Sequence, residues 1–230
     1  MLDNRFFNKD PERLAIALLG KILRRRINHP QAGNIWLAAR IIETEAYYLT
    51  EKGSHSSLGF TQKRKAMFMR PGTIYMYYAR GGDSLNFSAR GKGNGVLVKS
   101  GFPYIDKKSP ASNLDIMREL NPGGRTARPD ERLCNGQTLI CRSLHLKVPE
   151  WNQQQLHRSK FRLEEIEQGP VTIIQCQRIG IPPGRDHHLL LRFVDTRYAP
   201  FCTSNPLTKK NWKQGRDYLI LQTTTGETCD

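Results

Sequence analysis

The stretch 35–48 constrains the fold of this chain more than any other part of the sequence. It reads Ile-Trp-Leu-Ala-Ala-Arg-Ile-Ile-Glu-Thr-Glu-Ala-Tyr-Tyr and is rich in β-branched and aromatic residues. Turn-forming residues precede it at 29–33, and a polar segment follows it. This pattern predicts a long strand. Because the backbone groups of a strand need hydrogen-bonding partners, the chain must build a sheet around it.

A helix is predicted near the N-terminus. Asp10 suits the N-cap position, and Pro11 suits the first position of the helix. Apolar residues recur at helical spacing from Leu14 to Leu23. Lys21 and residues 24–26, all arginines, would lie on the other face of this helix.

The order of the remaining elements indicates the fold class. More strands follow the long one, then helices, and then strands again. We expect a mixed α+β fold with a curved, largely antiparallel sheet and surrounding helices. An apolar content of 38% in 230 residues suffices for one core, so residues 1–230 are expected to form a single domain. The further predicted strands are 73–78, 85–88, 95–99, 171–178 and 189–194, and the further predicted helices are 114–120 and 138–144.

The net charge points to a polyanionic partner. Lysine and arginine number 36 against 21 aspartates and glutamates, which gives a formal charge of +15. The basic residues are spread along the chain, so a disordered basic tail does not explain the excess. Nucleic acid is the partner that such a charge favours, and a highly soluble protein with cationic faces is the alternative.

Cysteine content and the N-terminus indicate the compartment. The five cysteines are an odd number without a Cys-x-x-Cys pair, which suggests neither a disulfide framework nor a zinc ribbon. The N-terminus lacks an apolar signal region, and the longest apolar run, 14–19, is too short to cross a membrane. We therefore expect a soluble intracellular protein, cytoplasmic and nucleoid-associated or nuclear, that is not secreted and has no membrane partner.

Two carboxylates near the end of the long strand are candidates for chemistry. Glu43 and Glu45 share one face if the strand is regular, because side chains two residues apart point the same way. Paired carboxylates can act as acid and base, but they can also neutralise basic neighbours such as Arg40. Aromatic residues nearby and the long polar loop 50–65, which holds His55, favour a site that binds a flat base.

Several motifs resemble the alkyladenine (3-methyladenine) DNA glycosylase family. The most specific are Ile-Glu-Thr-Glu-Ala-Tyr at 42–47, Met-Phe-Met-Arg-Pro-Gly-Thr-Ile-Tyr-Met-Tyr at 67–77, Leu-Asn at 85–86 and Gly-Lys-Gly at 91–93. Later segments at 114–118, 133–136, 178–181 and 191–193 resemble the same family. The similarity therefore spans nearly the whole chain.

The resemblance implies a role for each matching residue. Glu45 would activate the attacking water, and Tyr47, His55 and Tyr77 would line the base pocket by stacking. Asn86 would clash with the exocyclic amino group of a normal guanine. The substrate would be double-stranded DNA with a damaged purine that is flipped out of the duplex.

The chain departs from the family pattern at two places. Lys99 stands where the family usually has an arginine that helps to orient the water, and a lysine is a point charge rather than a planar fork. The segment 78–84 is one residue shorter than the pattern and lacks the tyrosine that usually fills the gap left by the flipped nucleotide. Arg80 is our candidate for that wedge, and phosphate binding is its alternative role.

These inferences combine into one functional expectation. The chain would be a monomeric, monofunctional DNA glycosylase of base excision repair that needs no metal and no cofactor. Its substrates would be alkylated or deaminated purines such as 3-methyladenine, 7-methylguanine, hypoxanthine and ethenoadenine. The alternatives are a metal-dependent nuclease, with Mg²⁺ held by Glu43 and Glu45, and a non-catalytic nucleic-acid-binding protein.

Overall fold

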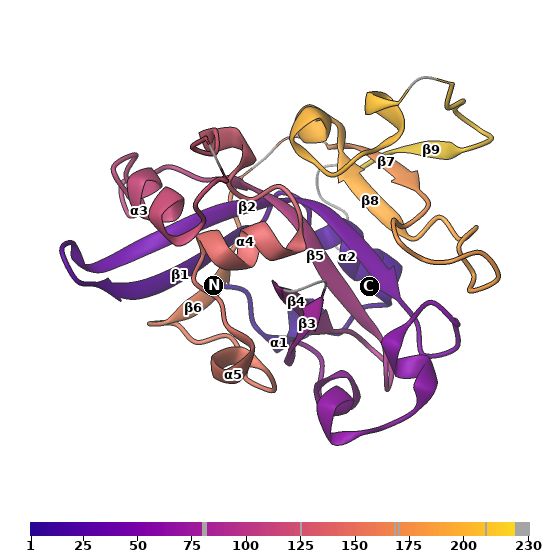
Figure 1. Cartoon of the computed structure of the whole chain (residues 1–230). Helices are drawn as coiled ribbons and strands as arrows, with labels where there is room; N and C mark the ends of the chain where they lie inside the picture. Colours follow the sequence, from indigo (N-terminus) through magenta and orange to yellow (C-terminus); the bar gives the residue numbers. More distant parts are fainter. Residues whose placement is uncertain (80–81, 125, 168, 170, 210, 224–230) are drawn as a thin grey trace.

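A nine-stranded sheet forms the centre of the molecule (Figure 1). The computed structural model describes residues 1–79, 82–124, 126–167, 169, 171–209 and 211–223. All pairings between the named strands of this sheet are antiparallel, which confirms the predicted mixed fold with an antiparallel sheet. The strands are β1 (Ile22–His29), β2 (Gly33–Tyr47), β3 (Ile74–Ala79), β4 (Gly82–Ser88), β5 (Gly95–Pro103), β6 (Phe161–Glu164), β7 (Thr172–Cys176), β8 (Arg192–Asp195) and β9 (Tyr218–Gln222).

The predicted long strand is confirmed as β2, and it organises the sheet. The main path runs β3-β4-β5-β2-β8-β7-β9, and β1 pairs with β2 and with β6. β2 therefore has β1, β5 and β8 as partners along its 15 residues. Its final part lies between β5 and β8, which buries both predicted carboxylates.

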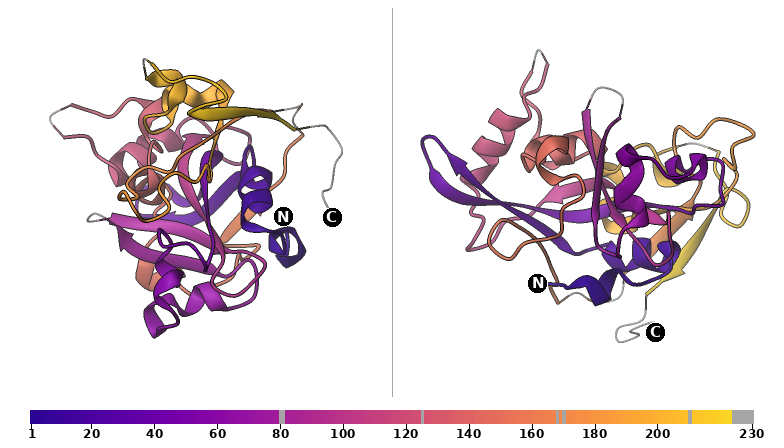
Figure 2. Two further views of the ribbon diagram at one scale, coloured as in Figure 1. Left: turned by 90° about the vertical axis from the view of Figure 1, so that its right-hand side faces the viewer. Right: turned by 90° about the horizontal axis from the view of Figure 1, so that it is seen from below.

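Helices cover both faces of the sheet (Figures 1 and 2). α4 crosses one face, whereas α2 lies on the other. The helices and 3₁₀ segments are α1 (Asn4–Phe7), α2 (Pro11–Leu18), η1 (His55–Leu58), η2 (Gln62–Phe68), α3 (Asn113–Leu120), η3 (Asp130–Arg132), α4 (Gln137–Ser143), α5 (Val148–Trp151), η4 (Thr196–Phe201) and η5 (Pro206–Thr208).

The predicted first helix is correct at its start and wrong at its end. Asp10 accepts a hydrogen bond from the Glu12 backbone N–H at 3.0 Å, as expected of an N-cap. The helix stops at Leu18, and Gly20 follows with φ of +80°, a conformation that glycine adopts without strain. Residues 22–29 then form β1, where the apolar residues that continue the helical pattern are buried by the sheet.

The basic residues expected on the exposed side of that helix are partly buried in β1. Arg24 is 1% exposed and bonds to Glu164 and Asp106. Arg25 reaches Glu150 and stacks over the ring of Trp151. These two arginines therefore contribute to the packing of the fold, and they are not available to a polyanion.

One row of paired residues runs across the sheet and brings polar side chains to one of its faces. Tyr75 pairs with Asn86, Asn86 with Leu97, Leu97 with Glu45, and Glu45 with Arg192. Directly paired residues of antiparallel strands project from the same face. The row crosses five strands and brings a tyrosine, an amide and a carboxylate from three of them to one side of the sheet.

Candidate active site

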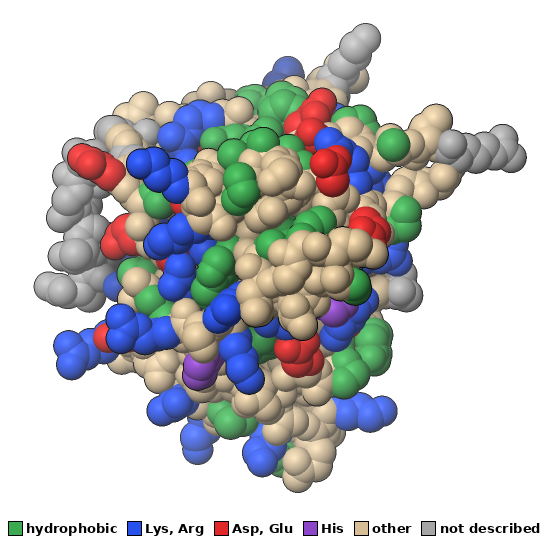
Figure 3. Space-filling model, turned by 90° about the vertical axis from the view of Figure 1, so that its left-hand side faces the viewer, with side chains coloured by type: hydrophobic (Ala, Val, Ile, Leu, Met, Phe, Trp, Pro, Cys, Tyr) green, Lys and Arg blue, Asp and Glu red, His purple; other side chains and the backbone are tan. Residues whose placement is uncertain are grey.

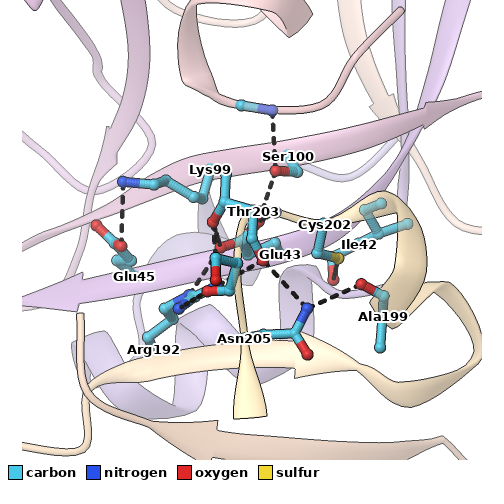
Figure 4. Close-up of polar contacts among 12 residues, drawn as sticks. Ile42, Glu43, Glu45, Lys99, Ser100, Arg192, Ala199, Cys202, Thr203 and Asn205 are labelled. Atoms are coloured by element: carbon cyan, nitrogen blue, oxygen red, sulfur yellow. Dashed lines mark hydrogen bonds and ion pairs between the residues drawn. The ribbon is translucent and has the colours of Figure 1, made fainter. Parts of the chain in front are cut away.

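A β-bulge in β5 positions two polar side chains against the carboxylates of β2. The register between the two strands shifts so that Glu43 pairs with Ser100 and Thr44 with Val98, which leaves Lys99 without a partner across the strand. A bulge turns side chains that a regular strand would direct elsewhere. Here Lys99 reaches Glu45 and Ser100 reaches Glu43 (Figure 4).

Glu45 is buried between two polar groups. Lys99 Nζ lies 3.2 Å from Oε1, and Tyr47 donates a hydrogen bond of 2.7 Å from its hydroxyl to Oε2. Oε1 is buried, and apart from this contact with Lys99 it accepts no hydrogen bond from the described residues. This oxygen retains the capacity to accept a proton from a water molecule.

The surroundings keep Glu45 ionised. Burial by itself would raise its pKa, but the positive charges of Lys99 and Arg192 and the hydrogen bond from Tyr47 outweigh burial. The net effect lowers the pKa of Glu45 below the ordinary value of 4.5. Burial and the carboxylate raise the pKa of Tyr47 well above 10, so its hydroxyl stays a donor.

Glu43 has a structural role, in contrast to its neighbour. It accepts hydrogen bonds from Ser100 Oγ at 2.5 Å, from Arg192 Nε at 2.7 Å, and from the backbone N–H and hydroxyl of Thr203 at 3.0 and 2.5 Å. Figure 4 shows these donors converging on the carboxylate. Both oxygens are therefore occupied by protein donors, and the partner that neutralises Glu43 is Arg192 rather than Arg40.

A cavity of about 700 Å³ lies beside the ion pair of Glu45 and Lys99. It is large enough for a bicyclic base together with its sugar. Glu45 does not itself line it, but Lys99 and Tyr47, which hold its carboxyl group, do. The cavity is also lined by His55, Met67, Tyr75, Tyr77, Tyr78, Asn86, Gly95 and Arg185.

Aromatic rings form one side of the cavity. The rings of Tyr75 and Tyr77 are stacked, with centroids 5.4 Å apart and an angle of 25° between their planes. His55, at the start of η1, contacts Tyr77 edge-on, and the centroids of the two rings are 4.3 Å apart. Partial burial and the charges of Arg64 and Arg185 lower the pKa of His55 below its ordinary value.

Gly95 and Asn86 also line the cavity. Gly95 pairs with Tyr47 and lines the cavity, and a Cβ at this position would come within 2.7 Å of Met67 Cε. Asn86 is 6% exposed and donates from Nδ2 to the backbone carbonyl of Tyr75 at 3.1 Å. The amide of Asn86 is thereby fixed at the cavity wall.

The structure thus brings Glu45, Tyr47, His55, Tyr77, Asn86 and Lys99 together, although they come from β2, η1, β3, β4 and β5. Arg80, the predicted wedge, lies outside the described residues. Tyr78, near the end of β3, is 65% exposed and also borders the cavity.

Sequence reasoning assigned no role to two arginines that support the site. Arg192 holds Glu43 and contributes to the charge around Glu45. Arg178 donates to the Ala46 carbonyl and lies over the ring of Tyr47. Both occur in segments that resemble the glycosylase family, but nothing in their spacing indicates which carboxylate or ring they contact.

A second, smaller pocket of about 380 Å³ shares Asn135 and Leu139 with the main cavity. It is also lined by Gly123, Arg128 and Arg132. The Nε of Arg128 is buried and has no hydrogen-bond partner among the described residues. Lys and Arg side chains are also distributed over the face that Figure 3 shows.

In the part of the chain that the structure describes, no group of three or more His, Cys, Asp or Glu side chains is arranged to hold a metal ion. No helix among these residues is long and apolar enough to cross a membrane. Cys134, Cys141, Cys176 and Cys202 are buried free thiols.

Comparison with known proteins identifies the family. Residues 5–199 match the model of the methylpurine-DNA glycosylase family. A Pseudomonas savastanoi protein, provisionally named a 3-methyladenine DNA glycosylase, is 56% identical over 96% of both chains. A Pseudomonas aeruginosa protein with the same provisional name is 54% identical over 96% of this chain and 90% of its own.

A mammalian relative extends the comparison. A mouse DNA-3-methyladenine glycosylase is 32% identical over 78% of this chain and 54% of its own length. The chain therefore belongs to the methylpurine-DNA glycosylase family of DNA repair enzymes, which are hydrolases that act on N-glycosyl bonds.

Proposed function

We propose that the protein flips an alkylated or deaminated purine out of duplex DNA and hydrolyses its N-glycosidic bond with a water activated by Glu45. The observation that carries the proposal is the state of this carboxyl group. Glu45 has a lowered pKa, one oxygen that Lys99 alone contacts among the described residues, and an adjacent cavity lined by aromatic rings. Such a group can deprotonate water and stabilise the cationic sugar that forms as the base departs.

The proposed substrates are purines whose damage eases either flipping or departure. Alkylation at N3 or N7 gives 3-methyladenine and 7-methylguanine, which carry positive charge and leave readily. Hypoxanthine and ethenoadenine are neutral and would need a donor near N7, for which the backbone near His55 is our candidate. A damaged or mispaired base also costs less to unstack than a sound one.

The base would stack within the aromatic part of the cavity. Tyr47, His55 and Tyr77 offer ring faces or edges there. Asn86 would exclude a normal guanine because its amide is held at the wall and cannot easily move away from the exocyclic amino group. Lys99 would keep Glu45 ionised and place the water beside Oε1.

The gap left in the duplex must be filled by a protein group. Arg80 remains our proposed wedge. Its exposed neighbour Tyr78 is a second candidate, because a tyrosine ring stacks on bases and this one has little packing to lose.

We further propose that the enzyme is a monofunctional monomer that acts in base excision repair, either at the nucleoid in the cytoplasm or in the nucleus. Lys99 is the one lysine among the described residues that line the cavity, and it is engaged by the carboxylate of Glu45. A protonated lysine is not a nucleophile. Water therefore attacks the sugar, and the strand is left intact at an abasic site.

The test is the release of free base from duplex DNA containing each proposed lesion, in the presence of excess chelator. The native protein should release base and leave an uncut strand. Glu45→Gln should lose about 10²- to 10⁴-fold in rate while DNA affinity is retained. Full activity of Glu45→Gln would contradict the assignment of Glu45 as the group that activates the water.

The same assay separates the alternatives. A metal-dependent nuclease would cut the strand and stop on addition of chelator, but the four donors on Glu43 leave it no free oxygen for Mg²⁺. A non-catalytic binder would bind the lesion-bearing DNA and release no base.

A further inference from the structure

Arg178 is a buried cation that the proposed mechanism does not use. It lies just beyond β7, and its side chain is 1% exposed. It does not line the cavity. It therefore lies behind the cavity wall, where it can act on a bound base only through the residues in front of it.

The contacts of Arg178 fix it in one place. Nη1 donates to the Ala46 carbonyl at 2.9 Å and to Glu51 Oε1 at 2.8 Å, while Nη2 pairs with Glu51 Oε2. Gly53 packs against the guanidinium, since a Cβ there would lie 3.2 Å from Nη2. Because both terminal nitrogens of the planar guanidinium are held by these contacts, the group cannot readily move away from Tyr47.

The guanidinium covers one face of the ring that forms a cavity wall. Its central carbon lies 4.5 Å from the centroid of Tyr47. A cation in this position attracts the electrons of the ring, and the ring then has less attraction left for a second cation on its opposite face. A base that stacks on this ring must therefore use the opposite face.

The charged side chains among the described residues that line the cavity are both cationic. Arg185 and Lys99 line it, and Arg64 bonds to the His55 carbonyl. Lys99 pairs with Glu45, which does not itself line the cavity. Among the described residues that line the cavity, none is a carboxylate that would compensate a positive charge on a bound base.

We propose that Arg178 is a positioning residue that sets selectivity by charge: it fixes the ring of Tyr47 and weakens its attraction for cationic purines relative to neutral ones. This inference rests on the proposed glycosylase function. A purely structural role would lower the excision of all lesions together, whereas the proposed role changes the ratio between them.

The experiment measures kcat/KM for duplexes with 7-methylguanine, which is cationic, and with hypoxanthine, which is neutral. The variant is Arg178→Gln with Glu51→Gln, which removes both charges of the buried pair and leaves neither partner alone. The ratio of cationic to neutral excision should rise about 2- to 30-fold over the native enzyme. Arg178→Lys keeps the charge, so its ratio should stay near the native value.

Tyr47→Leu provides an independent measurement if the double variant does not fold. Without the ring, the base loses the attraction of Tyr47 for a cation and also comes nearer to Arg178, so the ratio of cationic to neutral excision should fall below the native value. The loss of the hydrogen bond to Glu45 affects both lesions alike and cancels in the ratio.

The outcomes distinguish the two levels of the proposal. No release of either base by the native enzyme would overturn the proposed function. Release of both bases, with a ratio unchanged in the double variant or in Tyr47→Leu, would overturn the role of Arg178 alone.

Discussion

Lys99 and Glu45 form an ion pair because a bulge in β5 leaves Lys99 outside the regular pairing of the sheet. The distance from Nζ to Oε1 is 3.2 Å, and the lysine is the group of this pair that lines the cavity. Lys99 therefore brings a point charge, rather than a planar guanidinium, directly to the carboxylate. What the lysine does for the carboxylate can be measured.

Lys99→Met should move the acid limb of the pH–rate profile upward. Glu45 acts as a base only when ionised, so activity is present above its pKa and is lost as the pH falls through it. The charge of Lys99 holds that pKa below 4.5, and burial would raise it once the charge is removed. Single-turnover rates between about pH 4 and 8 would show the change.

Lys99→Arg is the matched control for this prediction, because it retains the charge, and its acid limb should stay below pH 4.5. An acid limb in Lys99→Met identical to that of the native enzyme would show that Lys99 does not set the ionisation of Glu45.

Asn86→Ser should extend base release to normal guanine. The amide of Asn86 is held by its bond to the Tyr75 carbonyl and occupies the cavity wall. The shorter serine would make room for an exocyclic amino group, and guanine release should rise at least about tenfold. Release of free guanine from undamaged duplex DNA is the measurement. An unchanged guanine rate, with damaged purines still released, would place the discrimination elsewhere.

Glu43→Ala should destabilise the fold. Removing this carboxylate leaves Arg192 buried without its partner, which costs about 3–5 kcal/mol in the free energy of unfolding. Urea denaturation would measure it. Glu165→Ala is the control, since Glu165 is 61% exposed in its pair with Lys21 and should contribute at most about 1 kcal/mol. Equal stabilities of the two variants would contradict the structural role of Glu43.

Arg128→Ala combined with Arg132→Ala should weaken DNA binding and reduce its salt dependence. Both side chains line the small pocket next to the main cavity, where a backbone phosphate flanking the flipped nucleotide would lie. Each lost phosphate contact should lower the slope of log affinity against log salt by about 0.9. Binding isotherms at several salt concentrations give that slope.

Arg158→Ala, an exposed residue outside both pockets, is the comparison for this prediction. If its salt slope falls as much as that of the double variant, the small pocket has no special role.

The order of residues along the chain determined the main strands of the sheet and most candidate residues of the site. Strand propensity and turn residues act over a few positions, so β2, β3, β4 and β5 could be predicted. The same local signals failed at β1, because its apolar residues continue the helical spacing of α2. There the left-handed conformation of Gly20 ends the helix, and pairing within the sheet makes residues 22–29 a strand.

Only the tertiary structure decided which groups meet. Arg178 contacts Glu51 across 127 positions of the chain, and Arg192 contacts Glu43 across 149. The different roles of Glu43 and Glu45 follow from such contacts. Both lie on one strand and are equally buried, but Glu43 is saturated by donors, whereas Oε1 of Glu45 contacts only Lys99 among the described residues. Sequence spacing cannot encode this difference, because partners are selected by the packing of strands that are remote in the chain.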